Sequence, residues 1–190
     1  MFIDMVKANR SYRRFYESEP IRKGTLLGLI NLARLSPSGA NRQSLRYYIS
    51  YEAGQNEKVF SALGWAAYLK DWQGPASGER PSAYIVMVQD QGYKMALPLD
   101  TGIAAQTILL GAVELGLGGC MIGNINHSGL QSALAIPANY EILLVIAMGK
   151  PKEEIVIDEI DPGADIKYWR DDQQVHHVPK RKLKDIILNQ

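Results

Sequence analysis

The longest apolar helix that the sequence predicts decides the fold, and it reads Asp100-Thr101-Gly102-Ile103-Ala104-Ala105-Gln106-Thr107-Ile108-Leu109-Leu110-Gly111-Ala112-Val113-Glu114-Leu115-Gly116-Leu117. An aspartate suits the first turn of a helix, and the glycines near the far end suit its C-terminal cap. Apolar side chains surround this helix almost completely, and such a helix must be buried on every side. In a chain of 190 residues, a dimer interface is the simplest way to bury it.

Two continuous apolar runs, at 83–88 and 142–148, predict strands that are buried on both faces. Further strands are expected at 47–51 and 120–123, and further helices at 2–9, 26–35 and 182–188. Two more helices are expected, one from a cap at Asn56 to Leu63 and one that begins at the Ser128-x-x-Gln131 capping box. The 64–81 segment is expected to be a loop-rich flap, and 151–178 reads as polar and irregular. Because strands and helices interleave without regular βαβ units, the sequence predicts an α+β fold.

Length and composition favour one domain over residues 1–190, in which about 151–190 form a C-terminal arm. With 21 basic and 20 acidic residues the net charge is +1, which argues against nucleic acid and acidic membranes as partners. The single Cys120 excludes an internal disulfide, and the three histidines lack metal-ligand spacing. No apolar signal core opens the chain, and the 103–117 segment is shorter than the roughly 20 residues of a membrane span, so we expect a cytoplasmic protein.

The run Arg10-Ser11-Tyr12-Arg13-Arg14-Phe15 places three guanidinium groups and a hydroxyl in one extended segment. Alternation along an extended chain puts Ser11 and Arg13 on one face, and a twist after the preceding helix would bring Arg10 to the same site. Arginine binds phosphate through two parallel hydrogen bonds and stays charged when partly buried. The alternative is a solvated basic strand edge that prevents edge-to-edge pairing.

The run Ser36-Pro37-Ser38-Gly39-Ala40-Asn41-Arg42-Gln43 is rich in backbone N–H groups and amide side chains. Free N–H groups there, together with the amides of Asn41 and Gln43, would hydrogen-bond the polar edge of a flat heteroaromatic ring. The alternative is an ordinary turn after a helix, since these are turn residues. Found together, the two segments indicate a bound flavin nucleotide and therefore electron transfer.

The glycine-rich run at 116–123 fits no phosphate-loop pattern, because it follows a helix and precedes a strand. We interpret its glycines as allowing the backbone to lie flat against a large ligand, with a helix C-cap and tight turn as the alternative. Lys180 and Arg181 are either a surface pair or extra phosphate ligands from the C-terminal arm. Cys120 is not expected to be a nucleophile, because it lies in an apolar strand.

These segments, together with residues 100–106 leading into 114–119, resemble the nitroreductase-like FMN-dependent oxidoreductases over essentially the whole chain. The resemblance implies a sandwich with a mainly antiparallel sheet of four to five strands, flanked by helices. It also implies an obligate homodimer with two FMN sites at the subunit interface, where the long buried helix lies. The sequence departs from the family at Ser44-Leu45, where many members have Pro-Trp, and in the short flap at 64–81.

The resemblance also implies which residues form the FMN site, by their positions in the matching segments. Arg10 and Ser11 would face the FMN phosphate and ribityl end, with Arg181, and also Lys180, closing it from the C-terminal arm. Arg13 would lie near the pyrimidine edge of the ring. Four residues would approach the ring from the partner subunit, namely Pro37, Ser38, Gly39 and Asn41. Gly118 and Gly119 would lie along its other side.

The resemblance implies ping-pong transfer of a hydride from NAD(P)H through FMN to a small unsaturated acceptor, such as a nitroaromatic or a quinone. The flavin carries the chemistry, so no catalytic side chain is expected. Three alternatives stay open: a specialised flavin enzyme of the same fold that performs reductive dehalogenation or flavin fragmentation, a non-enzymatic FMN-binding or storage protein, and a structural dimer without cofactor.

Overall fold

The computed structural model describes residues 1–92 and 98–189. Its main sheet has the order β1-β2-β4-β3, and every neighbouring pair is antiparallel. These strands are β1 (Leu45–Ser50), β2 (Ala83–Asp90), β3 (Gly118–Ile122) and β4 (Tyr140–Gly149). A second sheet, of order β5-β7-β6, contains β5 (Ile155–Ile160), β6 (Trp169–Arg170) and β7 (His176–Arg181). The predicted α+β class with an antiparallel four-stranded sheet is confirmed.

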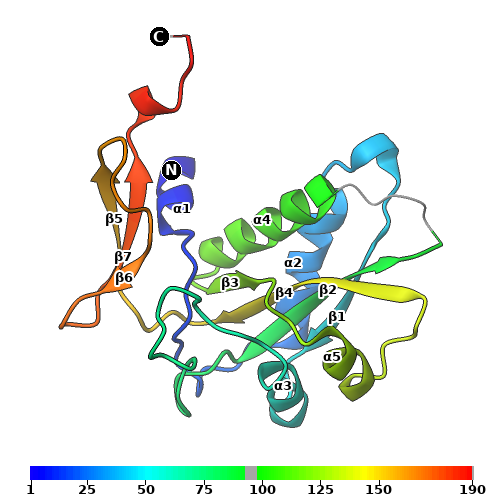
Figure 1. The fold of residues 1–190 in the computed structure, drawn as a ribbon. Coiled ribbons are helices and arrows are strands. Elements are labelled where there is room, and N and C mark those ends of the chain that lie inside the picture. The colour runs from blue at the N-terminus through cyan, green and yellow to red at the C-terminus, as the bar shows by residue number, and fades with distance from the viewer. Residues whose placement is uncertain (93–97, 190) are drawn as a thin grey trace.

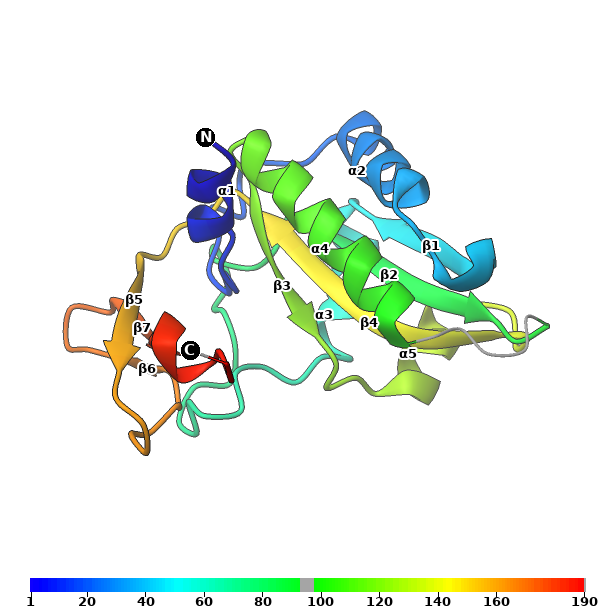
Figure 2. The same cartoon turned by 90° about the horizontal axis from the view of Figure 1, so that it is seen from above.

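Helices cover both faces of the main sheet (Figures 1 and 2). On one face lie α2 (Lys23–Leu35) and α4 (Pro98–Glu114), and on the other lie α3 (Ala53–Phe60) and α5 (His127–Ala133). The second sheet stands beside α1 (Phe2–Ala8), at one end of the sandwich. Two short 3₁₀ turns span Gly39–Asn41 and Leu183–Asp185.

The core lies in two layers, one on each side of the main sheet. Successive residues of β2 point to opposite faces, so Ile85 and Met87 join the layer under α2 and α4, whereas Tyr84 and Val86 join the layer under α3 and α5. All four side chains are fully buried. This two-sided burial explains why β2 reads as one continuous apolar run rather than as an alternating pattern.

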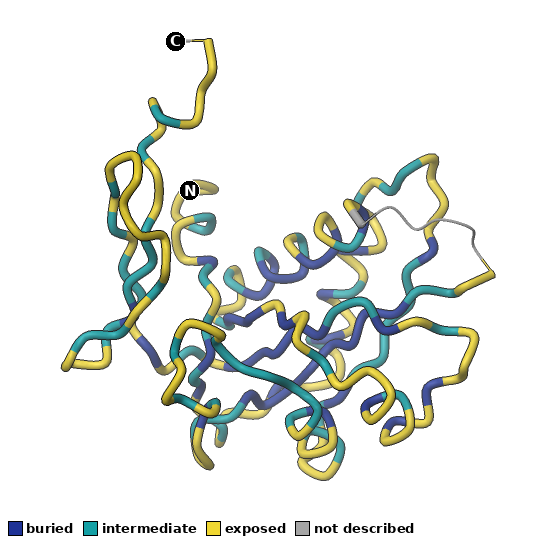
Figure 3. The backbone as a smooth tube through the Cα atoms, viewed as in Figure 1, coloured by how far each residue is buried: buried dark blue, intermediate teal, exposed yellow. Residues whose placement is uncertain are grey.

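The long helix α4 is buried on one side only within a single chain (Figure 3). Its inner face, including Ala105 and Ile108, is fully buried against the sheet and α2. Its outer face carries Leu99 and Ile103, which are 71% and 41% exposed. The expected burial on every side is therefore not achieved by one chain. Within residues 1–92 and 98–189, no helix combines the length and hydropathy that crossing a membrane requires.

Two predicted helix starts are wrong, because both helices begin before the predicted cap residue. α3 begins at Ala53, so Asn56 lies inside it, where its side chain accepts from the Ser50 hydroxyl and donates to the Ser82 carbonyl. α5 begins after Asn126, whose side chain accepts from the amide of Gly129. The Ser128 capping box is therefore not the N-cap.

The segment after β4 also differs from the prediction. Residues 151–178 are not irregular, because they hold β5, β6 and the first part of β7, and β5 and β7 pair in parallel. Short strands with mixed polar residues whose partners lie elsewhere in the chain leave only a weak local pattern. The helix expected at 182–188 is only the 3₁₀ turn Leu183–Asp185, since a short helix without a packing partner is marginal in water.

Candidate functional site

The segment 10–15 is extended, as predicted, and is held by two parts of the chain. Ser11 forms a parallel β-bridge to Gly119 at the start of β3, and the amide of Tyr12 donates to the Gly119 carbonyl at 3.1 Å. Phe15 is fully buried and forms a bridge to Pro151, just after β4. The segment is therefore fixed at both ends against the edge of the main sheet.

The arginines of this segment point in different directions. The Arg14 guanidinium binds the Glu79 carboxylate through two hydrogen bonds of 2.6 and 2.7 Å, and this pair, joined by Lys152, holds the pKa of Glu79 at about 2. Arg10 donates to the Val6 carbonyl at 3.0 Å, whereas its buried Nε has no hydrogen-bond partner in the described part of the chain. Arg14 thus has a structural partner, and Arg10 keeps a free donor.

Arg13 is buried, and its guanidinium meets three groups. Its Nη1 donates to the Ser11 carbonyl at 3.1 Å and lies 3.3 Å from Nε2 of His176. Its Cζ lies 4.7 Å from the centroid of the Tyr168 ring. A cation over an aromatic face, held by two polar contacts, has little rotational freedom. The orientation of Arg13 is therefore fixed before any ligand binds.

A buried carboxylate, Glu153, joins the 10–15 segment to the second sheet. It accepts hydrogen bonds from the backbone amides of Arg13 and Arg14, and its other oxygen lies 2.9 Å from Nη2 of Arg170. The Glu153 side chain is wholly buried and that of Arg170 is 9% exposed. A buried charge of this kind is tolerated only with several donors around it. Glu153 consequently positions Arg13 through its main chain.

A cavity of about 330 Å³, here called the cationic cavity, opens where the 10–15 segment, α4, β3 and β7 meet. It is lined by Asn9, Arg10, Ser11, Arg13, Gln106, Leu109, Met121, Tyr168, His176, Val178 and Lys180. Four predicted site residues, Arg10, Ser11, Arg13 and Lys180, are thus brought together. Arg181 is not among the lining residues, because alternate residues of β7 face opposite sides.

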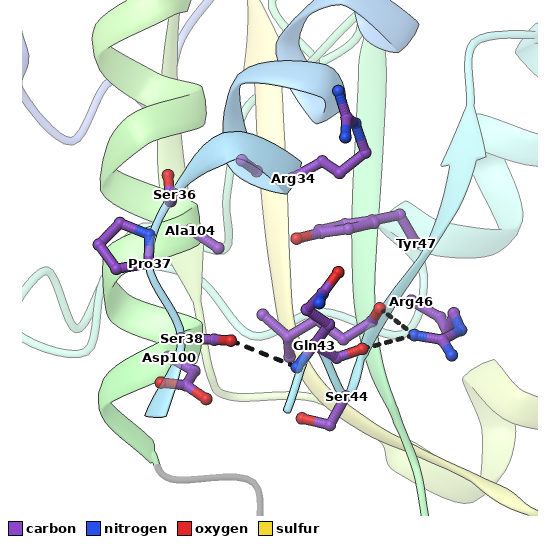
Figure 4. Close-up of a pocket in the computed structure, with 12 residues that line it drawn as sticks. Arg34, Ser36, Pro37, Ser38, Gln43, Ser44, Arg46, Tyr47, Asp100 and Ala104 are labelled. Carbon is purple, nitrogen blue, oxygen red and sulfur yellow. Dashed lines mark hydrogen bonds between the residues drawn. The ribbon is translucent and has the colours of Figure 1, made fainter. Parts of the chain in front are cut away.

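Another part of the predicted site forms a separate hollow of about 130 Å³, here called the loop cavity (Figure 4). Pro37 and Ser38 line it beside Asp100 of α4, with Tyr47 of β1 on the opposite wall. Asp100 is buried, and its carboxylate accepts from the amide of Gly39 at 2.9 Å. Gly39 and Asn41 do not line this hollow and belong to the 3₁₀ turn that follows Ser38.

Most backbone N–H groups of this loop donate hydrogen bonds to other groups of the same chain, contrary to the expectation that they are free. The amide of Asn41 donates to the Ser38 carbonyl, that of Arg42 to the Gly39 carbonyl, and that of Gln43 to the Ser38 hydroxyl. The Gln43 side chain donates to Oδ1 of Asn41 at 3.2 Å. Ala40, Asn41 and Gln43 all have positive φ values near 50°. Such backbone strain in residues other than glycine is concentrated at functional sites.

The glycines of β3 are explained by packing inside the chain. A Cβ on Gly118 would lie 2.5 Å from the Tyr12 ring, and one on Gly119 would lie 2.6 Å from the Ala147 carbonyl and 2.7 Å from Leu109. Both residues are buried within the single chain. Close approach of protein segments therefore accounts for these glycines without a ligand.

The flap at 64–81 packs on the second sheet through aromatic contacts. Tyr68 contacts Tyr168 with ring centroids 4.9 Å apart, and the Trp72 ring lies 4.4 Å from Cζ of Arg170. Trp65 packs instead against the core layer under α3 and α5. Thus one of the three flap aromatics packs on the core, Tyr68 contacts Tyr168 in the wall of the cationic cavity, and Trp72 contacts Arg170 of β6.

His176, Tyr168 and Glu153 are functional candidates that the sequence interpretation missed. Reading 176–181 as a strand would have placed His176, Val178 and Lys180 on one face. Burial and the charges of Arg13 and Arg170 lower the pKa of His176 to about 4. Burial raises the pKa of the Cys120 thiol, which fits its predicted inertness. No group of three or more His, Cys, Asp or Glu residues within 1–92 and 98–189 is placed to hold a metal ion.

An antiparallel four-stranded sheet between two helical layers, with a cationic cavity at its edge, defines a nitroreductase-type α+β protein. The chain belongs to the nitroreductase family, whose model matches residues 6–150. It is 26% identical over 170 residues to the NADPH-flavin oxidoreductase of Vibrio harveyi, an alignment that covers 80% of this chain and 66% of the relative.

Solved structures share the fold. A nitroreductase family protein from Streptococcus pneumoniae TIGR4 matches all of this chain and all of its own with a TM-score of 0.71 at 15% identity. An FMN-dependent nitroreductase from Clostridium difficile R20291 matches 80% of this chain and 88% of its own with a TM-score of 0.63 at 23% identity. At these identities the likeness establishes the fold alone.

Proposed function

We propose that this chain is a flavin-dependent oxidoreductase that binds FMN at the cationic cavity. The observation that carries the proposal is the convergence of Arg10, Ser11, Arg13 and Lys180 on one cavity. Two relatives bear names of the same kind, since the Vibrio harveyi protein is an NADPH-flavin oxidoreductase and the Clostridium difficile protein is an FMN-dependent nitroreductase. We infer that the electrons pass from NAD(P)H to a small unsaturated acceptor.

The chemistry of the cavity wall fits a flavin nucleotide. The guanidinium groups and the Lys180 ammonium offer N–H donors to a phosphate, and guanidinium matches phosphate geometry in particular. Leu109, Met121 and Val178 provide an apolar surface of the kind that a flat ring system needs. Buried N–H donors that lack partners among the described residues, such as Nε of Arg10, favour an electron-rich ligand.

The residues of this chain would bind and orient the cofactor, and would adjust its electronics. Bound FMN supplies the hydride chemistry. Arg13, whose direction is fixed by the Ser11 carbonyl and His176, would stabilise negative charge at the edge of the ring. Such a cation stabilises the reduced state more than the oxidised state, which is how it would favour electron uptake.

We further propose a homodimer in which each site combines the cationic cavity of one subunit with the 36–43 loop of the other. Within one chain the two parts of the predicted site line separate cavities. The outer face of α4 leaves Leu99 and Ile103 exposed, and a second subunit would cover such side chains.

Complementation between variants tests this arrangement. Arg13→Ala damages the cationic cavity, and Asp100→Ala releases the 36–43 loop from its anchor. When the two inactive variants are unfolded and refolded together, half of the dimers are hybrids with one intact site of two, so about a quarter of wild-type activity should return. Activity that does not return in the mixture, although each variant folds and dimerises, would contradict the shared site.

Initial-velocity kinetics test the reaction itself. The protein reconstituted with FMN is assayed with NADPH or NADH against a quinone and a nitroaromatic. Parallel double-reciprocal lines are expected, because reductant and acceptor would occupy the same face of the cofactor in turn. If the protein binds FMN but oxidises NAD(P)H no faster than free FMN does, it is instead a flavin-storage protein.

A further inference from the structure

His176 is a polar side chain in the wall of the cationic cavity that the resemblance does not assign. It begins β7, and its amide donates to the Glu154 carbonyl at 2.9 Å. Its residue exposure is 1%, and it lies on the same face of β7 as Val178 and Lys180. The ring packs beside Tyr168, with the centroids 5.2 Å apart.

The neighbour of this imidazole fixes its tautomer. Nε2 lies 3.3 Å from Nη1 of Arg13, and a guanidinium has only donors, so Nε2 must be the acceptor. Burial and the nearby charges of Arg13 and Arg170 keep the ring neutral at pH 7. A neutral imidazole that accepts at Nε2 carries its proton on Nδ1.

That Nδ1 proton has no acceptor in the described part of the chain, although the atom is buried. An unsatisfied buried donor is costly, and most such groups are paired in native proteins. Among the other polar groups around the cavity, Arg10, Arg13 and Lys180 are donors only, and no oxygen of Asn9, Ser11, Gln106 or Tyr168 accepts from Nδ1. The missing partner is therefore an acceptor of the kind that an electron-rich ligand brings.

We propose that His176 is a further cofactor-site residue, which donates a hydrogen bond from Nδ1 to an oxygen or nitrogen of the bound flavin nucleotide. This inference rests on the proposed function. It also gives Nε2 a separate task, because that atom orients Arg13. The two ring nitrogens thus have distinct roles that two substitutions can separate.

His176→Asn keeps an N–H near the position of Nδ1 and loses the acceptor for Arg13. His176→Gln places its amide near the position of Nε2, so it keeps that acceptor and loses the donor at Nδ1. We measure FMN affinity of the apoprotein by quenching of flavin fluorescence. We expect His176→Asn to stay within about threefold of wild type, because the Ser11 carbonyl and the Tyr168 ring still hold Arg13. We expect His176→Gln to weaken binding about tenfold, which is 1.4 kcal/mol.

His177→Gln is the matched control, because His177 points to the other side of β7. It stacks on Trp169 with centroids 4.2 Å apart, and its Nδ1 lies 2.9 Å from Asp158. This variant should bind FMN like wild type. Circular dichroism and thermal unfolding without FMN check that every variant folds.

Riboflavin and inorganic phosphate distinguish the two possible acceptors. If His176→Gln weakens riboflavin binding as much as FMN binding, the hydrogen bond lies at the ring. If it weakens the binding of FMN and of inorganic phosphate but not of riboflavin, the bond lies at the phosphate. Equal FMN affinity in all variants, or a larger loss in His176→Asn than in His176→Gln, would overturn the inference while the proposed function stands. No FMN binding by the wild type would overturn both.

Discussion

Replacing Glu153 with glutamine tests how the 10–15 segment is held. Gln keeps one oxygen to accept from the amides of Arg13 and Arg14, but it removes the negative charge opposite Arg170. Because both side chains of the pair are at least nine-tenths buried, water cannot replace the lost carboxylate. The variant therefore leaves a buried guanidinium without its counterion.

The expected loss follows from that geometry. Breaking a buried ion pair by removing one partner costs about 3–5 kcal/mol. The Trp72 ring, 4.4 Å from Cζ of Arg170, and the retained amide hydrogen bonds reduce this loss. We therefore expect Glu153→Gln to lower the free energy of unfolding by about 2–3 kcal/mol, which moves the urea midpoint down by about 1 M. FMN affinity should stay close to that of wild type, because the retained amide hydrogen bonds still hold the main chain of Arg13.

Urea unfolding followed by circular dichroism, at one protein concentration, measures the effect. Glu19→Gln is the control, since the Glu19 and Lys150 side chains are 55% and 52% exposed and their pair should contribute less than about 0.5 kcal/mol. In the double variant Glu153→Gln, Arg170→Met the loss should be smaller than the sum of the single losses, because neither charge remains buried alone. A Glu153→Gln variant as stable as Glu19→Gln would refute this reasoning.

Three further predictions concern binding, acid stability and packing. Arg13→Ala should weaken FMN binding about 10- to 100-fold and lower the two-electron potential by about 30 mV, as calorimetry and redox titration would show; an effect no larger than that of Lys23→Ala would exclude Arg13 from the site. The pKa of Glu79 is lowered from 4.5 to about 2, so its ion pairs stabilise the fold above pH 4.5 and are lost as the pH falls toward 2. Over that window wild type should lose up to about 3 kcal/mol more than Glu79→Gln in urea titrations, and equal losses would contradict the pairing. Gly119→Ala should lower the stability of the fold by about 2 kcal/mol or more, measured by thermal unfolding. Gly123→Ala should leave it unchanged, because no atom lies within 4 Å of the added Cβ. Equal unfolding midpoints for the two variants would count against the packing explanation.

The main sheet and its covering helices were predictable because their patterns are local and strong. The apolar run at 83–88 predicts the burial of β2 directly, whichever partners it packs against. The helix expected at 100–117 is present as α4 (Pro98–Glu114), although only its inner face is buried within one chain. The extended 10–15 segment was likewise predictable, and Ser11 and Arg13, which alternation placed on one face, line the same cavity.

What the sequence did not reveal depends on contacts between distant residues. The pairing of β5 with β7 joins segments that look polar and irregular when read alone. The role of Glu153 as an anchor could not be predicted, because it depends on the fold that places this carboxylate beside the amides of residues 13 and 14. The choice of Lys180 over Arg181 at the cavity depends on the register of β7, and a shift of one residue would reverse it.

An absorbance spectrum of the purified protein, followed by anaerobic addition of NADPH or NADH, tests the central claim most directly. The proposed function predicts a bound-flavin spectrum that bleaches on addition of the nicotinamide and returns when a quinone or nitroaromatic is added. Protein that is colourless as purified and remains so after incubation with FMN and removal of unbound FMN would contradict it.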